Sequence, residues 1–168
     1  MSNKIILGVK NETINLLKSQ ILLEFSASVQ YLNSSSWCEI NGYLNSASFL
    51  KRQSDEERNH MLKIFQYLLD IGVQAEHPLN FEVENNFSSF RNVFQHAMNS
   101  ESVVTNFVRN FADHCHEVSD YSTLKIINWF VEEQIEEEKT MQKILGFFDL
   151  LGEDKLSLYH VDLEIGKM

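Results

Sequence analysis

The sequence predicts an all-α fold: an antiparallel four-helix bundle with a long crossover between the second and third helices and a short C-terminal fifth helix. Three observations support it. Apolar residues recur at steps of three and four over four long segments, the spacing that returns to one face of a helix. One proline and six glycines among 168 residues leave little to interrupt long helices. With 43% hydrophobic and 23% charged residues, residues 1–168 have the composition of a single globular domain.

The first two long helices are expected over residues 10–38 and 44–72. The inward face of the first carries, in order, Ile14, Leu17, Ile21, Glu24, Ser28, Tyr31 and Ser35. The inward face of the second carries Leu50, Gln53, Glu57, His60, Ile64, Tyr67 and Ile71. The connection "EINGY", residues 39–43, is short, so these two helices are expected to be antiparallel neighbours.

The third and fourth long helices are expected over residues 89–118 and 122–150. The inward face of the third carries Phe94, Ala97, Glu101, Val104, Val108, Phe111, Cys115 and Val118. The inward face of the fourth carries Ile127, Phe130, Gln134, Glu137, Met141, Ile144 and Phe148. Only "SDY", residues 119–121, separates them, so they too are expected to be antiparallel neighbours.

The connection between the second and third helices, residues 72–89, is long and holds the only proline, Pro78. A helix of nearly thirty residues is about 40 Å long, at about 1.5 Å per residue. An extended chain covers at most about 3.5 Å per residue, so this connection can run the full length of the bundle. The second and third helices are therefore expected to be parallel.

After Gly152, a short fifth helix is expected over residues 154–165. Leu156, Tyr159 and Leu163 recur along it at helical spacing. We expect it to dock outside the bundle, where a contact between subunits is a natural use for it.

The net charge of −10 disfavours binding to nucleic acids or anionic membranes and favours cationic partners. No apolar run reaches the roughly 18 residues that a membrane-spanning helix needs. The N-terminal "MSNKIILGVKNETI" has too short an apolar patch for a secretory signal. Cys38 and Cys115 have no CxxC spacing. We expect them to be reduced core thiols of a cytoplasmic protein.

Each inward face is interrupted near its midpoint by side chains that bind protons or metals. They are Glu24, Tyr31, Glu57, His60, Glu101, Gln134 and Glu137. Helix midpoints share a level in a bundle whatever the helix direction, so these side chains are expected to converge. Buried carboxylates are unfavourable when isolated and repel one another when clustered. No lysine or arginine occupies an inward position at that level.

A set of oxygen ligands with one nitrogen fits a pair of metal ions. Bundles that bind such pairs use Glu-x-x-His, because two residues three positions apart on a helix can direct the carboxylate and the imidazole to the same cation. Residues 57–60, "ERNH", have this pattern. Taken alone, Glu24 and Glu101 are compatible with boundary or exposed positions, and Tyr31 and His60 with ordinary core residues. Their joint occurrence at one level favours the metal site.

The acidic run "EEQIEEEKT", residues 132–140, follows the same periodicity. Gln134 and Glu137 point inward, and the next positions round the helix form a rim. The rim is expected to contain Glu133 and Glu136 from this run, together with Glu56 across the bundle, while Glu132 and Glu138 point to solvent or to a partner. The rim predicts a second, more exposed cation site, and a solvated acidic surface is the alternative.

Nearly the whole chain resembles the non-haem bacterial ferritins. The resemblance rests on "LLEFSASVQYLNSSSWC", "FLKRQSDEERNHMLKIFQYL", "INWFVEEQIEEEK" and "LYHVDLE". It implies a ferritin-like fold and a homo-oligomeric shell of 24 subunits. Such a shell oxidises Fe(II) with O2 or peroxide and stores the iron as a ferric mineral.

The resemblance also implies roles for individual residues. One iron would be held by Glu24, Glu57 and His60. The other would be held by Glu57 as a bridge, Glu101 and Glu137, with Gln134 beside it. Tyr31 would hydrogen-bond to the site and supply an electron. The third iron site of the bacterial branch corresponds to Glu56, Glu133, Glu136 and Glu137.

The chain departs from related families at identifiable positions. Haem-binding bacterioferritins carry a methionine where this chain has Arg58, and a second Glu-x-x-His where it has Gln134 and Glu137. We therefore expect no haem and no rubrerythrin-type site. Animal ferritins line their three-fold pore with carboxylates where this chain has Leu124 and Ile127. An acidic pore of that kind is not expected.

Two other functions compete with iron storage. One is a di-iron oxygenase or peroxidase without a shell. A monomer or dimer in solution would favour this function. The other is a catalytically silent shell, against which the full set of ligands argues. A DNA-binding mini-ferritin fits poorly, because the chain has no basic arm.

Overall fold

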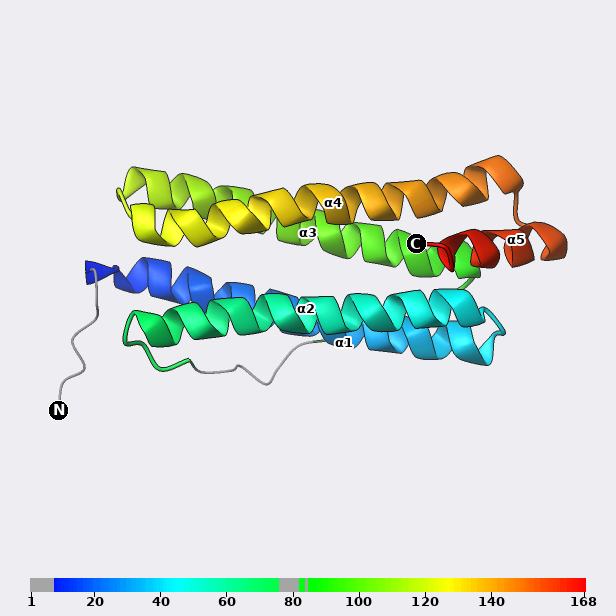
Figure 1. The fold of residues 1–168 in the computed structure, drawn as a ribbon, viewed down its shortest axis with the longest axis horizontal. Coiled ribbons are helices and arrows are strands. Elements are labelled where there is room, and N and C mark those ends of the chain that lie inside the picture. Colours follow the sequence, from blue (N-terminus) through cyan, green and yellow to red (C-terminus); the bar gives the residue numbers. More distant parts are fainter. Residues whose placement is uncertain (1–7, 76–81, 84) are drawn as a thin grey trace.

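The structure is a computed structural model that describes residues 8–75, 82–83 and 85–168 (Figure 1). Its helices are α1 (Asn11–Ile40), α2 (Leu44–Asp70), α3 (Phe90–Glu117), α4 (Tyr121–Leu151) and α5 (Lys155–Ile165). There is no β-strand among the described residues, so the prediction of an all-α fold is confirmed. Helix ends lie within about two residues of the expected positions, which is the usual uncertainty of a helix boundary.

The four long helices form two antiparallel pairs, α1 with α2 and α3 with α4 (Figure 1). Within each pair a short turn joins the helices, residues 41–43 in the first and 118–120 in the second. The α2 and α3 helices run in the same direction, because α2 ends and α3 begins at opposite ends of the molecule (Figure 1). The predicted crossover is therefore confirmed, while Pro78 lies outside the described residues.

Three helices begin at a residue whose side chain accepts a hydrogen bond from the first turn. Ser89 Oγ accepts from the backbone N–H of Asn92 at 3.1 Å, and Asp120 accepts from that of Thr123 at 3.0 Å. Asp154 caps α5 in the same way. Such caps typically contribute about 1 kcal/mol. They fix where α3, α4 and α5 begin.

The apolar core is divided into two clusters, one toward each end of the bundle. The cluster near the α1–α2 turn packs Phe90, Phe94 and Phe148 together. The cluster at the other end includes Phe111 and Phe130. Polar side chains fill the level between the two clusters, as the interrupted inward faces predict.

The predicted inward faces are buried with two exceptions, Tyr67 and Val118, which are half-buried. Both stand near the last turn of their helices. A strict seven-residue repeat drifts about 20° per heptad from the periodicity of a straight helix. In α2 this drift brings Leu68 to the fully buried position, and the Tyr67 hydroxyl instead lies 2.9 Å from Thr123 Oγ1.

The short α5 helix packs on the end of the bundle through Val161 and Ile165, both fully buried. Its Asp162 carboxylate accepts hydrogen bonds from the backbone N–H of Ser46 at 2.8 Å and from its hydroxyl at 2.6 Å. Of the residues that recur at helical spacing along α5, Leu156 and Tyr159 lie at the surface and are 65% and 58% exposed. Val161 and Ile165, which pack on the bundle, are four residues apart and lie on a different face of α5.

Cys38 and Cys115 are free and buried, and they belong to different core clusters. The prediction of core thiols without a disulfide is confirmed. Burial raises the pKa of each thiol to about 12, so neither is a nucleophile near neutral pH. Within the part of the chain that the structure describes, no helix has the length and apolarity to cross a membrane.

Candidate metal centre

Four helices present acidic side chains to one buried level of the bundle. Each of the following side chains is at most 5% exposed: Glu24 of α1, Glu57 and His60 of α2, Glu101 of α3, and Glu137 of α4. The helices bury these groups because each occupies the inward face of its helix, and Glu24 and Glu101 lie between apolar residues one turn away on either side. The sequence-predicted residues therefore converge in the structure.

Their ligand atoms fall into groups that could each hold one cation. In one group, Glu24, Glu57 and His60 offer atoms that all lie within 4.8 Å of one another. In a second, Glu57, Glu101 and Glu137 meet the same limit. Glu57 belongs to both groups, which is the arrangement that a carboxylate bridging two metal ions requires.

Hydrogen bonds orient several of these carboxylates. Tyr31 donates to Glu101 Oε1 at 2.5 Å, and Gln20 donates to Glu24 Oε1. His60 Nδ1 lies 3.3 Å from Glu57 Oε2. The carboxylates are thus held in fixed positions by groups on other turns and other helices.

Electrostatics at the centre favour a cation. Burial, followed by repulsion from Glu57, raises the pKa of Glu24, and burial raises the pKa of Glu101. Burial and then repulsion from Glu101 raise the pKa of Glu57, and the same causes raise that of Glu137 to about 9. Among the described residues, no lysine or arginine forms an ion pair with any of these carboxylates.

Three buried oxygens at this level have no hydrogen-bond partner among the described residues. They are Oε1 of Gln20, Oε2 of Glu24 and Oε1 of Glu57. An unpaired buried oxygen is unfavourable, and a metal ion would satisfy it. Hard oxygen donors with one imidazole nitrogen suit first-row divalent ions such as Fe(II). The donor set therefore fits the predicted di-metal centre.

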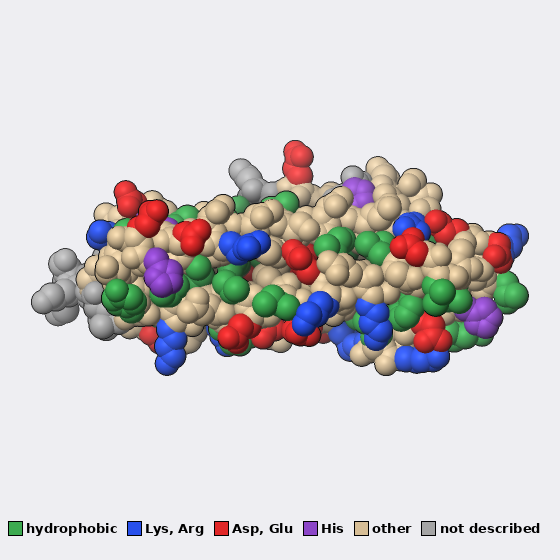
Figure 2. Space-filling view, turned by 90° about the horizontal axis from the view of Figure 1, so that it is seen from above, with side chains coloured by type: hydrophobic (Ala, Val, Ile, Leu, Met, Phe, Trp, Pro, Cys, Tyr) green, Lys and Arg blue, Asp and Glu red, His purple; other side chains and the backbone are tan. Residues whose placement is uncertain are grey.

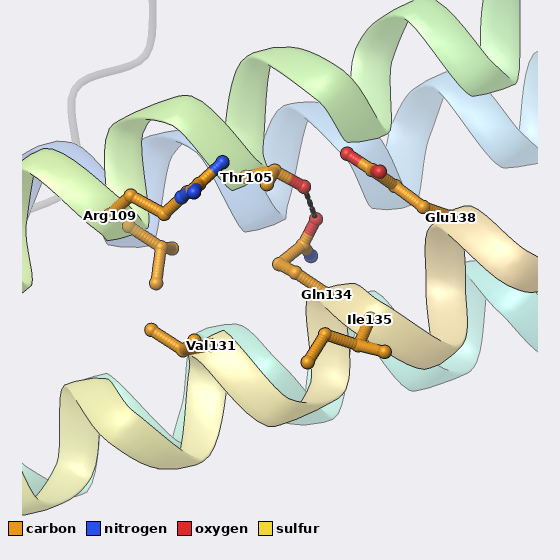
Figure 3. Close-up of a pocket in the computed structure, with 7 residues that line it drawn as sticks. Thr105, Arg109, Val131, Gln134, Ile135 and Glu138 are labelled. Carbon is orange, nitrogen blue, oxygen red and sulfur yellow. Dashed lines mark hydrogen bonds between the residues drawn. The ribbon is translucent and has the colours of Figure 1, made fainter.

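Gln134 lies at the edge of the centre and is 2% exposed. Its Oε1 accepts a hydrogen bond from Thr105 Oγ1 at 2.9 Å (Figure 3). Gln134 also lowers the pKa of Glu101, against the larger effect of burial. Gln134 thus acts on the centre through Glu101.

The acidic rim is only partly assembled. Glu56 is exposed, yet it offers an oxygen within 4.8 Å of ligand atoms of His60 and Glu137. Burial raises the pKa of Glu137 most, followed by repulsion from Glu101 and Glu56. Glu133, which is half-buried, raises it further. Glu136 is exposed and forms an ion pair with Lys139 at 2.9 Å. The structure therefore brings Glu56, but not Glu136, to the centre.

The orientation of the acidic run differs from the prediction at one position. Glu132 is exposed, as expected. Glu138 is half-buried and lines a pocket between α3 and α4, rather than pointing away to solvent (Figure 3). It follows Gln134 by one turn, so both side chains lie on the side of α4 that faces α3.

Two residues at the centre were not identified from the sequence, Gln20 and Thr105. Gln20 precedes Glu24 by one helical turn, and Thr105 follows Glu101 by one turn. That i, i+4 spacing is the only signal that could have indicated them. Amides and hydroxyls at that spacing are common on helices, so the signal is weak.

Comparisons with known proteins agree with this geometry. Residues 14–151 match the Ferritin family, described as a ferritin-like domain. A probable bacterial non-heme ferritin-like protein of Haemophilus influenzae is 32% identical over 160 residues, covering 95% of this chain and 97% of that protein. A bacterial non-heme ferritin of Escherichia coli O157:H7 is 33% identical over 163 residues, with the same coverage. The open pore ferritin of Archaeoglobus fulgidus superposes with a TM-score of 0.91 at 25% identity, covering 95% of this chain and 98% of that one.

Proposed function

Because the chain belongs to the Ferritin family of ferritin-like domains, we propose that it stores iron and oxidises Fe(II) at a di-iron centre inside each subunit. One observation carries the proposal. Two groups of three ligands share Glu57 in the core, where the described part of the chain offers no lysine or arginine to balance their charge. Iron is thus both substrate and cargo.

Binding of Fe(II) displaces protons from the buried carboxylates. One iron takes Glu24, Glu57 and His60, and the other takes Glu57, Glu101 and Glu137. Because burial favours the protonated carboxyl, iron must compete with protons for these ligands, and its binding weakens as the pH falls. Weak binding suits a site that must release its product.

Oxidation removes one electron from each of two Fe(II) ions. O2 accepts the two electrons with two protons and becomes hydrogen peroxide, or hydrogen peroxide accepts them with two protons and becomes two waters. Fe(III) is the stronger Lewis acid, so it binds water as hydroxide and releases protons. Hydrolysed Fe(III) then leaves the centre for the stored mineral. Tyr31 holds Glu101 through its 2.5 Å hydrogen bond during these steps.

The acidic rim forms a third, more exposed iron site in this proposal. Glu56 and Glu137 supply its first ligands. Each has a carboxylate oxygen that lies within 4.8 Å of the other's and of a ring nitrogen of His60. Glu133 and Glu136 extend it outward. A site of this kind sits between the buried centre and solvent, where it can take up iron as the centre empties.

Storage requires a shell, and we propose an assembly of 24 subunits in the cytoplasm. Hydrophobic side chains lie at the surface at the end of the molecule where α5 docks (Figure 2). They include Leu150, Leu156 and Tyr159, which are 82%, 65% and 58% exposed and suit contacts between subunits. Leu124 and Ile127 are buried in α4, so they do not line a pore for iron.

One experiment tests both parts of the proposal. Wild-type protein, the Glu57→Ala variant and the Glu132→Ala variant are sized by light scattering, and ferrous iron is then added in air while oxidation is followed by absorbance. We expect all three to form large particles. The wild type and Glu132→Ala oxidise iron rapidly and keep it in solution, and Glu57→Ala loses the fast phase.

Glu132→Ala is the matched control, because it removes the same charge from an exposed position of α4. A wild-type rate in Glu57→Ala would refute the assignment of the centre. A wild-type protein that stays a monomer or dimer yet oxidises iron would refute storage and favour a di-iron oxygenase or peroxidase. Oxidation no faster than in buffer would favour a silent shell.

A further inference from the structure

The hydrogen bond between Thr105 and Gln134 joins α3 to α4 beside the metal centre. Thr105 is half-buried and follows Glu101 by one helical turn. Figure 3 shows its hydroxyl directed at the side-chain oxygen of Gln134, and the two oxygens lie 2.9 Å apart.

This hydrogen bond determines which end of the Gln134 amide faces the carboxylates. Since Oε1 accepts from Thr105, the amide nitrogen is the end of the side chain left to face Glu101. Burial raises the pKa of Glu101, and Tyr31 and Gln134 both lower it, as donors beside a carboxylate do. Tyr31 donates a hydrogen bond to this carboxylate. Thr105 therefore orients Gln134, and Gln134 in turn influences a carboxylate of the centre.

Packing alone does not hold Gln134 in this orientation. On its outer side lies a pocket between α3 and α4 with a volume of about 300 Å³. The pocket is lined by Thr105, Val108, Arg109, Val131, Gln134, Ile135 and Glu138 (Figure 3). A glutamine side chain has space to rotate into it. The hydroxyl of Thr105 is thus the contact that keeps the amide turned toward Glu101.

We infer that Thr105 is a positioning residue of the metal centre, which acts through Gln134 to hold Glu101 in place for iron. The inference rests on the proposed ferroxidase function. Without the hydroxyl, Gln134 is free to turn into the pocket, and its influence on Glu101 is lost. Glu101 then meets iron in a less defined position, and oxidation slows.

The test compares Thr105→Val with Thr105→Ser. Valine has nearly the shape of threonine but no hydroxyl, whereas serine keeps the hydroxyl and loses a methyl group. Residues that orient metal ligands typically contribute 10–100-fold to activity. We expect Thr105→Val to slow single-turnover Fe(II) oxidation by about tenfold. Thr105→Ser is expected to keep the wild-type rate.

A second readout does not depend on oxidation. Co(II) is bound without air, and its visible absorption spectrum reports the geometry of its ligands. The spectrum should change in Thr105→Val and not in Thr105→Ser. Circular dichroism establishes that each variant is folded, and Thr105→Ala replaces the valine variant if the latter is not.

A double-mutant cycle shows whether Thr105 acts through Gln134. In a Gln134→Leu background, Thr105→Val should cause no further loss of rate. Additive losses, a serine variant as slow as the valine variant, or an unchanged Co(II) spectrum in Thr105→Val would each overturn the inference. If the wild type itself does not oxidise iron, the proposed function fails, while the Co(II) spectra still decide the role of Thr105.

Discussion

The carboxylates of the acidic rim have different surroundings. We therefore expect them to contribute to the proposed third iron site to different degrees. Glu56 lies within reach of His60 and Glu137, and Gln53 donates a hydrogen bond to it at 2.8 Å. Glu136 is exposed and pairs with Lys139. Surface ion pairs of this kind contribute about 0–1 kcal/mol, so Lys139 does not hold Glu136 firmly away from a third iron.

We predict that replacing Glu56 or Glu136 by glutamine alters the amount of iron oxidised in the first phase more than the initial rate. The effect of Glu56→Gln should be the larger, because Glu56 already lies beside the buried ligands. Stopped-flow measurements at increasing ratios of iron to subunit give both quantities, and Glu132→Gln is the matched control. Progress curves unchanged in both variants would exclude the third site.

The sequence predicts the buried ligands because each is a polar residue in an apolar periodic pattern. Glu24, Glu57 and Glu101 stand out for this reason, and their common level follows from helix midpoints. Thr105 and Gln20 could not be predicted in the same way. Their roles depend on hydrogen bonds across or along the bundle, and a polar residue beside an inward position has no distinctive pattern.

At the scale of the helices, α5 depends on a single buried carboxylate. Asp162 receives three hydrogen bonds at 2.6–2.8 Å from Ser46 and from the side chain of Asn45, at the start of α2. Val161 and Ile165 flank it in the core. The carboxylate therefore fixes the angle at which α5 leaves the bundle.

We predict that Asp162→Ala lowers the free energy of unfolding by about 2–3 kcal/mol, since hydrogen bonds to charged groups contribute about 1.5–3 kcal/mol. Urea denaturation followed by circular dichroism measures the loss. Glu164→Ala is the control, because within the described part of the chain the side chain of Glu164 pairs only with the exposed Lys167. Equal stability of the two variants would show that the apolar contacts alone dock α5.

The bounds and topology of the long helices follow from the sequence, whereas the docking face of α5 does not. A periodic pattern over nearly thirty residues specifies the buried face through many repeats. An eleven-residue helix offers only three turns, and two alternative apolar faces compete. Leu156 and Tyr159 form the exposed one, and the contact of Asp162 with α2 selects the other.

For the molecule as a whole, the buried carboxylates link stability to pH. The pKa of Glu137 rises from 4.5 to about 9 in the folded protein. An acid with a raised pKa binds more protons when folded than when unfolded. The contribution of Glu137 to stability is therefore fully present below about pH 4.5 and is lost as the pH rises toward 9.

We predict that the free energy of unfolding of the metal-free protein falls between pH 6 and pH 8, and that Glu137→Gln reduces this fall. Metal ions bind the deprotonated carboxylates, so saturation with Co(II) should abolish the fall and release protons that a pH-stat detects. Urea denaturation at the two pH values tests the first part. A metal-free protein that is as stable at pH 8 as at pH 6 would contradict it.

The division of the core into two apolar clusters has a mechanical consequence. Each end of the bundle is held together by its own apolar packing, whereas the polar level between them is joined by hydrogen bonds such as those of Tyr31 with Glu101 and of Thr105 with Gln134. A cation bound by the four helices' carboxylates, as we propose, would add direct links between the helices at this level. Under the proposed function, the middle of the bundle would then be stiffer with iron bound than after iron has left.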